Sequence, residues 1–198
     1  AVALDKTGTL TEGKPVVTDV VAYGRPEAEV VRLAAALETG SSHPLAKAIL
    51  DRAAKDGTDV PPADDAKALG GKGVTGVVEG AEILLASPKA AAERVPLDDE
   101  QSKRISAFND EGKTVSVLIT GNAVAGILAM RDEPRADAAA GLKALADNGI
   151  RTVMLTGDNR RTAEAIGRQL GIEVRAELLP EDKQRIVGEL KAQGLKVA

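Results

Sequence analysis

The pattern of apolar and polar residues changes once along the chain, near Pro134. Beyond that residue, short apolar runs typical of strands alternate with longer segments typical of helices. The expected helices span residues 135–146, 160–170 and 181–192, and the expected strands span residues 150–155, 173–176 and 195 onward. Such regular alternation predicts βαβ units and a parallel sheet. The apolar run of residues 1–4 reads as a buried strand and belongs with this half.

The middle of the chain has a different pattern, in which strands follow one another and helices are grouped. Strands are expected at residues 15–23, 67–69, 74–79, 82–86, 114–120 and 123–130. Helices are expected at residues 28–38, from a cap at Ser41 or Ser42 to Gly57, from Ser87-Pro88, and at residues 98–110. We therefore predict a discontinuous α/β domain of residues 1–17 and 122–198, with an inserted α+β domain of residues 18–121.

Composition narrows the class of protein. Of 198 residues, 43% are apolar and 28% are charged, which is ordinary for a soluble globular protein. The net charge of −4 and the lack of a basic block argue against a nucleic-acid partner. The absence of cysteine excludes disulfides and thiolate metal sites, and the single histidine, His43, cannot form a histidine cluster. No run approaches the ~18 apolar residues of a membrane span.

The first chemical signal is the segment of residues 5–11, DKTGTLT, which directly follows the apolar run. An aspartate at the C-terminal end of a buried strand lies where open α/β sheets bind their ligands. Gly8 suits a tight turn whose backbone N–H groups hold phosphate. Asp5 is therefore a candidate carboxylate nucleophile for a phosphoryl group. The alternative is an ordinary capped turn after a strand, with an incidental aspartate.

Two further segments could complete such a site. Residues 156–159, TGDN, follow an expected strand and open a helix, an arrangement that suits a phosphate group, although it also reads as a strand end with a helix cap. Lys183 lies in the first turn of the last expected helix, where a cation is unfavourable for the helix dipole. The alternative for Lys183 is a solvated surface lysine.

Together these segments resemble the motifs of P-type ATPases, which have a haloacid dehalogenase-like fold. The resemblance implies that Asp5 forms an aspartyl-phosphate, that Thr156 holds the transferred group, and that Asp158 positions the nucleotide or the closing domain. Lys183, in a P-x-D/E-K setting, would neutralise the phosphoryl oxygens. The implied catalytic set is Asp5, Lys6, Thr7, Thr156, Gly157, Asp158 and Lys183. Mg²⁺ would be bound by Asp5 and the Thr7 carbonyl.

The inserted domain carries a resemblance of its own. Residues 41–45, SSHPL, are similar to the His-Pro motif of heavy-metal-transporting P-type ATPases, in which the histidine contacts adenine. Residues 71–74, GKGV, match a Gly-x-Gly element, and residues 131–135, RDEPR, resemble a hinge. The implied ATP-binding set is Ser42, His43, Pro44, Gly71, Gly73, Val74, Asp132 and Arg135. Ser42 and the Ala86-Ser87 pair depart from the family pattern of Glu and Gly-Asn.

The resemblance extends over essentially the whole chain and implies the ATP-binding, autophosphorylating cytosolic module of a heavy-metal exporter. The expected cofactors are ATP and Mg²⁺. The expected partners are the transmembrane and actuator domains of the same polypeptide, at the cytoplasmic face of the plasma membrane, and a metal cation bound outside this chain. Residues 74–79, 131–135 and 178–183 look closest to zinc, cadmium, lead and cobalt exporters. A copper transporter is the alternative.

The remaining expectations concern the ends of the chain and the alternative functions. We expect both ends to be cuts through a larger protein, with the GDGxNDxP motif and its Mg²⁺-binding aspartate beyond residue 198, and little turnover without it. A phosphatase of the same superfamily would usually carry a general acid where Thr7 stands. A module that only binds nucleotide is the remaining alternative, and the complete 5–11 segment argues against it.

Overall fold

The computed structural model describes residues 1–198, which divide into two compact units. Unit 1 comprises Ala1–Lys14, Asn109–Lys113 and Asp132–Ala198, and unit 2 comprises Pro15–Phe108 and Thr114–Arg131. No helix is long and apolar enough to span a bilayer.

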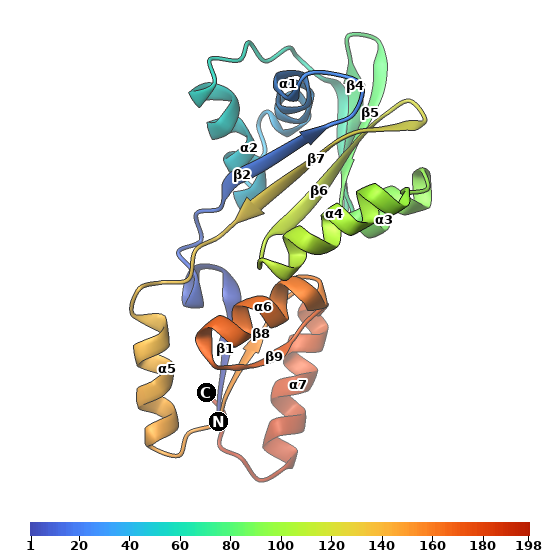
Figure 1. Ribbon diagram of the computed structural model, residues 1–198. Helices are drawn as coiled ribbons and strands as arrows, with labels where there is room; N and C mark the ends of the chain where they lie inside the picture. The colour runs from blue at the N-terminus through green and yellow to red at the C-terminus, as the bar shows by residue number, and fades with distance from the viewer. The chain divides into compact units, whose positions relative to one another are not determined.

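Unit 1 is built on a parallel sheet of order β1-β8-β9 (Figure 1). Its elements are β1 (Val2–Asp5), α5 (Ala138–Asp147), β8 (Thr152–Leu155), α6 (Arg160–Leu170), β9 (Glu173–Arg175) and α7 (Pro180–Ala192). Alternate residues of β8 face opposite sides: Met154 packs with α5 and α6, whereas Val153 and Leu155 pack with α7. Helices therefore cover both faces of the sheet, as the alternating sequence pattern predicts.

The last residues of the chain lie beside β1. Ala3 N–H donates to the Ala198 carbonyl at 2.9 Å, and Ala198 N–H donates to the Ala1 carbonyl at 3.1 Å. The strand expected from residue 195 onward is thus represented by a few backbone hydrogen bonds and not by a regular strand.

Unit 2 is built on an antiparallel sheet of order β2-β7-β6-β5-β4-β3. Its strands are β2 (Val16–Ala22), β3 (Asp64–Leu69), β4 (Gly73–Val78), β5 (Ala81–Ala86), β6 (Thr114–Thr120) and β7 (Ala123–Arg131). Its helices are α1 (Glu27–Glu38), α2 (Pro44–Lys55), α3 (Pro88–Arg94) and α4 (Asp99–Asp110). Helices α1 and α2 pack on one face of the sheet, and α3 packs against β5 and β6 on the other.

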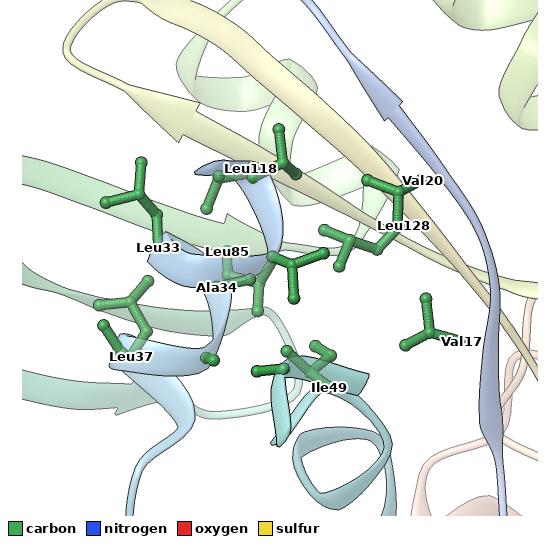
Figure 2. Packing of buried hydrophobic residues seen from close by; sticks show 14 of the residues in the cluster. Val17, Val20, Leu33, Ala34, Leu37, Ile49, Leu85, Leu118 and Leu128 are labelled. Carbon is green, nitrogen blue, oxygen red and sulfur yellow. The ribbon is translucent and has the colours of Figure 1, made fainter. Parts of the chain in front are cut away.

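Apolar side chains without aromatic rings fill the core between the sheet and α1 and α2. Figure 2 shows Leu33, Ala34 and Leu37 of α1 and Ile49 of α2 facing Leu118 and its neighbours on the sheet. The same layer contains Val17, Val20, Leu85 and Leu128. The sequence has one Phe, one Tyr and no Trp, so close packing here depends on branched and small residues.

The unit boundaries differ from those expected from the sequence. The expected boundary at residues 121 and 122 separates β6 from β7, but β7 pairs with both β6 and β2. Residues 124–130 are all buried, as in a central strand covered on both faces. A strand in that position cannot leave the sheet, and the boundary therefore lies after Arg131. The first crossing lies at Lys14 and Pro15, three residues before the expected position.

Candidate active site

Asp5 lies at the C-terminal end of the first strand of unit 1. It pairs in register with Leu155 of β8, so the next residue, Thr156, follows at the same edge of the sheet. The Asp5 Oδ1 atom lies 2.6 Å from Lys183 Nζ at the start of α7. The Asp5 side chain is 50% exposed. The structure thus brings together a solvent-accessible carboxylate and an ammonium that are 178 residues apart in sequence.

The loop after Asp5 makes a sharp turn at Gly8, where φ is +75°. Thr7 has an extended backbone, and both residues are exposed to solvent. Gly13 also has a positive φ of +71°, and a Cβ on it would lie 3.2 Å from Gly8 Cα. The loop is closed by Thr11, whose backbone N–H donates to the Lys6 carbonyl at 3.1 Å. A side chain at Gly8 would be strained by its backbone conformation.

Lys6 points into the unit and not into solvent. Its side chain is only 8% exposed, and Nζ lies 2.6 Å from Asp158 Oδ2. A buried ammonium requires a partner of opposite charge, and Asp158 supplies it. The contact ties the loop after β1 to the turn after β8.

The turn at residues 156–159 is fixed on three sides. The buried Thr156 accepts a hydrogen bond at Oγ1 from Asp158 N–H (3.1 Å), and its own N–H donates to the Arg175 carbonyl (3.0 Å). A Cβ on Gly157 would lie 3.2 Å from the Leu178 carbonyl. Asn159 caps α6 by accepting from Thr162 N–H at 3.0 Å. The hydroxyl, the backbone turn and the capped helix therefore form one rigid element.

Asp132 lies where the chain returns to unit 1. Its carboxylate accepts hydrogen bonds from Thr11 Oγ1 (2.5 Å) and from Lys14 N–H (3.1 Å). Thr11 also forms an antiparallel bridge with Pro134, and Arg135 N–H donates to the Leu10 carbonyl. Asp132 thus holds together the two segments that lead into and out of unit 2. The Arg135 side chain is exposed and pairs with Asp137.

In unit 2, His43 is the residue that caps α2. Its Nδ1 accepts from Leu45 N–H at 3.2 Å, so the expected cap at Ser41 or Ser42 is wrong. A histidine can replace serine there because an unprotonated ring nitrogen accepts a hydrogen bond as a hydroxyl does. Pro44 occupies the first helical position, where its missing N–H has no cost. His43 and Ser42 are both exposed.

The two glycines of the 71–74 segment have different surroundings. A Cβ on Gly73, where φ is +149°, would lie 2.1 Å from the Leu85 carbonyl oxygen and 2.6 Å from Ala86 Cα. Gly71 has a φ of +69°, and open space lies where its Cβ would be. Val74 is partly buried against the core. Gly73 is therefore required by the pairing of β4 with β5, whereas Gly71 leaves the backbone accessible.

Comparison with known proteins identifies the family of the chain. The model of the haloacid dehalogenase-like hydrolases matches residues 1–198. The chain belongs to the haloacid dehalogenase-like hydrolase family. The predicted fold class is thereby confirmed.

Within this family, the chain is similar to heavy-metal P-type ATPases, which confirms the resemblance found in the sequence. It is 42% identical to a copper-transporting P-type ATPase of Rhizobium leguminosarum bv. viciae, over 98% of this chain and 23% of that protein. It is 43% identical to a zinc/cadmium/lead-transporting P-type ATPase of Escherichia coli (strain K12), over 96% of this chain and 25% of that protein. The chain spans about a quarter of the length of these relatives.

A solved structure extends the similarity to the fold. The catalytic domain of the CPx-ATPase CopB-B, studied for conformational changes upon nucleotide binding, is 27% identical with a TM-score of 0.75. The similarity covers 100% of this chain and 68% of that one.

The edge of the sheet that carries Asp5 offers oxygen atoms of the kind that Mg²⁺ binds. Asp5 uses one carboxylate oxygen for Lys183 and is half exposed, and the neighbouring Thr7 is exposed as well. No group of three or more His, Cys, Asp or Glu residues gathers into a metal site anywhere in the chain. A sparse oxygen set suits Mg²⁺, which keeps several waters and binds substrate phosphates alongside one or two carboxylates.

Glu38 lies near His43 but is not among the residues predicted from the sequence. Glu38, the last residue of α1, is about half buried, and burial raises the pKa of its carboxyl while His43 and Ser41 lower it. Because Glu38 lies outside the 41–45 motif at an ordinary helical position, its sequence context gave no signal. Only the turn between α1 and α2 brings its carboxyl beside the imidazole.

Proposed function

We propose that this chain is the cytosolic catalytic module of a heavy-metal P-type ATPase. In this proposal, unit 2 recognises the adenine end of ATP, and Asp5 of unit 1 receives the γ-phosphoryl group. The similarity to heavy-metal P-type ATPases over nearly the whole chain supports the module. The contact of Asp5 with Lys183 at the edge of the parallel sheet is the observation that supports phosphoryl transfer to Asp5.

Phosphoryl transfer at Asp5 forms one bond and breaks one. A carboxylate oxygen of Asp5 attacks the γ-phosphorus in line, the bond from this phosphorus to the β–γ bridging oxygen breaks, and ADP leaves with the electron pair. The product is a mixed anhydride on Asp5. Asp5 and the Thr7 carbonyl would hold a magnesium ion, which would neutralise charge on the phosphate oxygens.

The charges around Asp5 support this step. Lys183 Nζ already contacts the attacking carboxylate. When that carboxylate loses its charge in the mixed anhydride, the ammonium can pair with the new phosphoryl oxygens. Lys6 and Asp158 neutralise one another, so the pair holds the loop without competing for phosphate. Thr156 lies directly beyond the partner of Asp5 in the sheet, and in this proposal its hydroxyl holds the transferred group.

The side chain at position 7 supports a pump over a phosphatase. A hydrolase of this family needs a general acid and base near its nucleophile, and Thr7 cannot take that role at neutral pH. A phosphoenzyme without such a group persists, and a persistent phosphoenzyme can be coupled to transport.

For the nucleotide, we propose a site around His43 and Gly71 in unit 2. The Nδ1 atom of His43 is occupied by Leu45 N–H, which leaves Nε2 and the ring face for adenine. Glu38 lies beside the ring and Gly71 has an open backbone face. Ser42, Pro44, Gly73 and Val74 remain predicted members of this site. Asp132 and Arg135, also predicted to support ATP binding, make their contacts within unit 1.

The transported cation, the membrane location and the partner domains belong to the same proposal. The sequence favours zinc, cadmium, lead or cobalt, and the zinc/cadmium/lead relative is 43% identical. The copper relative, at 42%, keeps copper as the second candidate. ATPase stimulation of the full-length protein by Zn²⁺ and Cd²⁺, compared with Cu⁺ and Ag⁺, decides between them. The transmembrane and actuator domains would be the partners, with this module at the cytoplasmic face of the plasma membrane.

The central test is phosphate labelling of the full-length protein with γ-labelled ATP. We expect acid-stable, hydroxylamine-sensitive label that Asp5→Asn abolishes. The matched control is Asp147→Asn, which removes an exposed carboxylate at the end of α5 and leaves the labelling unchanged. Persistent label in Asp5→Asn would overturn the proposal.

A further inference from the structure

A hollow of about 280 Å³ lies in unit 1 between the edge strand β9 and helix α7. Apolar residues, among them Val153, Ile186 and Leu190, contribute to its lining. Four arginines also line it: Arg151, Arg160, Arg175 and Arg185. Glu173 and Glu189 are the only acidic residues of the lining. The proposed phosphoryl transfer uses none of these side chains.

The positive charge of the hollow is unevenly compensated. Arg185 is matched by two carboxylates, Asp182 at 3.0 Å and Glu189 at 2.6 Å. Arg151 and Arg175 instead share the single carboxylate of Glu173, at 2.8 and 2.9 Å. With Arg160 included, the lining outside α7 therefore contains three arginines and one carboxylate.

Arg160 is the least compensated of the four. No side-chain hydrogen bond or ion pair holds its guanidinium, and it is the first residue of α6. The N-terminus of a helix carries partial positive charge, so a cation there is electrostatically unfavourable unless an anion lies nearby. The neighbouring Arg161 is paired with Asp110, which leaves Arg160 as the unpaired guanidinium of this turn.

We propose that this hollow binds a small phosphate-type anion through Arg151, Arg160 and Arg175. The surplus of two positive charges favours an anion with more than one negative charge, and planar guanidinium forks donate paired hydrogen bonds to phosphate oxygens. The known contacts use Nε and Nη2 of Arg151 and Nη2 of Arg175, so each guanidinium keeps further N–H groups for a ligand. The site is separate from Asp5 and does not depend on the proposed ATPase activity.

The test is a titration of this chain with pyrophosphate, without Mg²⁺ and at low ionic strength, followed by backbone amide shifts in NMR spectra. We expect saturable shifts at residues 151 and 173–176. The double variant Arg160→Gln/Arg175→Gln should bind pyrophosphate at least tenfold more weakly. The matched control, Arg168→Gln/Lys191→Gln, removes the same charge from exposed positions outside the hollow and should bind within twofold of the parent chain.

A second variant keeps the test decisive if the double variant does not fold. Glu173→Gln removes the carboxylate that competes with the ligand and should tighten pyrophosphate binding several-fold. Vesicles that carry a phosphoinositide form a parallel arm. If the parent chain binds these vesicles and Arg160→Gln/Arg175→Gln does not, the phosphate ligand is a lipid headgroup. If the chain binds pyrophosphate but not the vesicles, the ligand is a free solute. Equal binding in the double variant and its control, unchanged binding in Glu173→Gln, or shifts confined to residues 5–9 and 156–158 would overturn the proposal.

Discussion

The two units hold their candidate site residues in different ways. In unit 1, the charged groups hold one another across long stretches of sequence, as Lys6 does with Asp158 and Asp5 with Lys183. In unit 2, His43 is held by the backbone two residues away, and its ring is exposed. Site and fold are therefore interdependent in unit 1, whereas in unit 2 an aliphatic core supports a site made of surface residues.

The sharpest way to break this comparison is Lys6→Ala. The substitution leaves the Asp158 carboxylate largely buried without its partner, so we expect a loss of about 3 kcal/mol in the free energy of unfolding of unit 1. Urea denaturation followed by tryptic cleavage of unit 1 would measure it. Lys143→Ala, which removes an exposed pair with Asp147, should cost less than about 0.5 kcal/mol. Equal losses in both variants would show that the buried pair is not structural.

Gly73→Ala tests whether the stability of unit 2 depends on the close approach of the β4 and β5 backbones at Gly73. The added methyl would meet the Leu85 carbonyl and Ala86 Cα of β5, and we expect a loss of about 2–3 kcal/mol. The control is Gly71→Ala, whose methyl enters open space and costs about 1 kcal/mol for the left-handed backbone alone. Thermal unfolding of both variants gives the difference, and the reverse order would contradict the assigned roles.

His43→Ala separates binding from folding in unit 2. Loss of the helix cap should cost only about 1 kcal/mol of stability, while ATP affinity falls at least several-fold. Isothermal titration of the folded variant with ATP measures the second effect. Asp51→Ala changes an exposed residue of α2 that is not in the predicted ATP-binding set and is the control. Affinity equal to that of the parent chain would remove His43 from the adenine site.

The smallest expected effect is a pH dependence from Glu38. Burial raises the pKa of its carboxyl in the folded state above the usual value of 4.5, so the folded chain binds the proton more tightly than the unfolded chain. The contribution of Glu38 to stability is therefore present below pH 4.5 and lost as the pH rises through the folded-state pKa. Glu38→Gln should flatten this decline in urea denaturation midpoints. An unchanged pH profile would place Glu38 in solvent.

The comparison also explains which parts of the fold could be predicted. Most helices and strands follow from local patterns, such as the Pro and Ser that begin α3 and the Gly171 that ends α6. The domain boundary could not be predicted from the local pattern, because the hairpin at Gly121 indicates a turn but not the place where the chain passes from one sheet to the other. The position of β7 depends on its pairing with β2, which is about 110 residues earlier.

For the candidate site, the sequence by itself determined the proposed chemistry: residues 5–11, 156–159 and 183 supply the side chains that the proposed phosphoryl transfer needs. Only the tertiary structure decided what each group does. In the folded chain, Lys6 is buried against Asp158, Asp132 bonds Thr11 where the chain returns to unit 1, and Glu38 lies beside His43. The physical reason is that a short motif specifies a backbone turn and a set of side chains, whereas burial and charge pairing arise from residues that only the folded chain brings together.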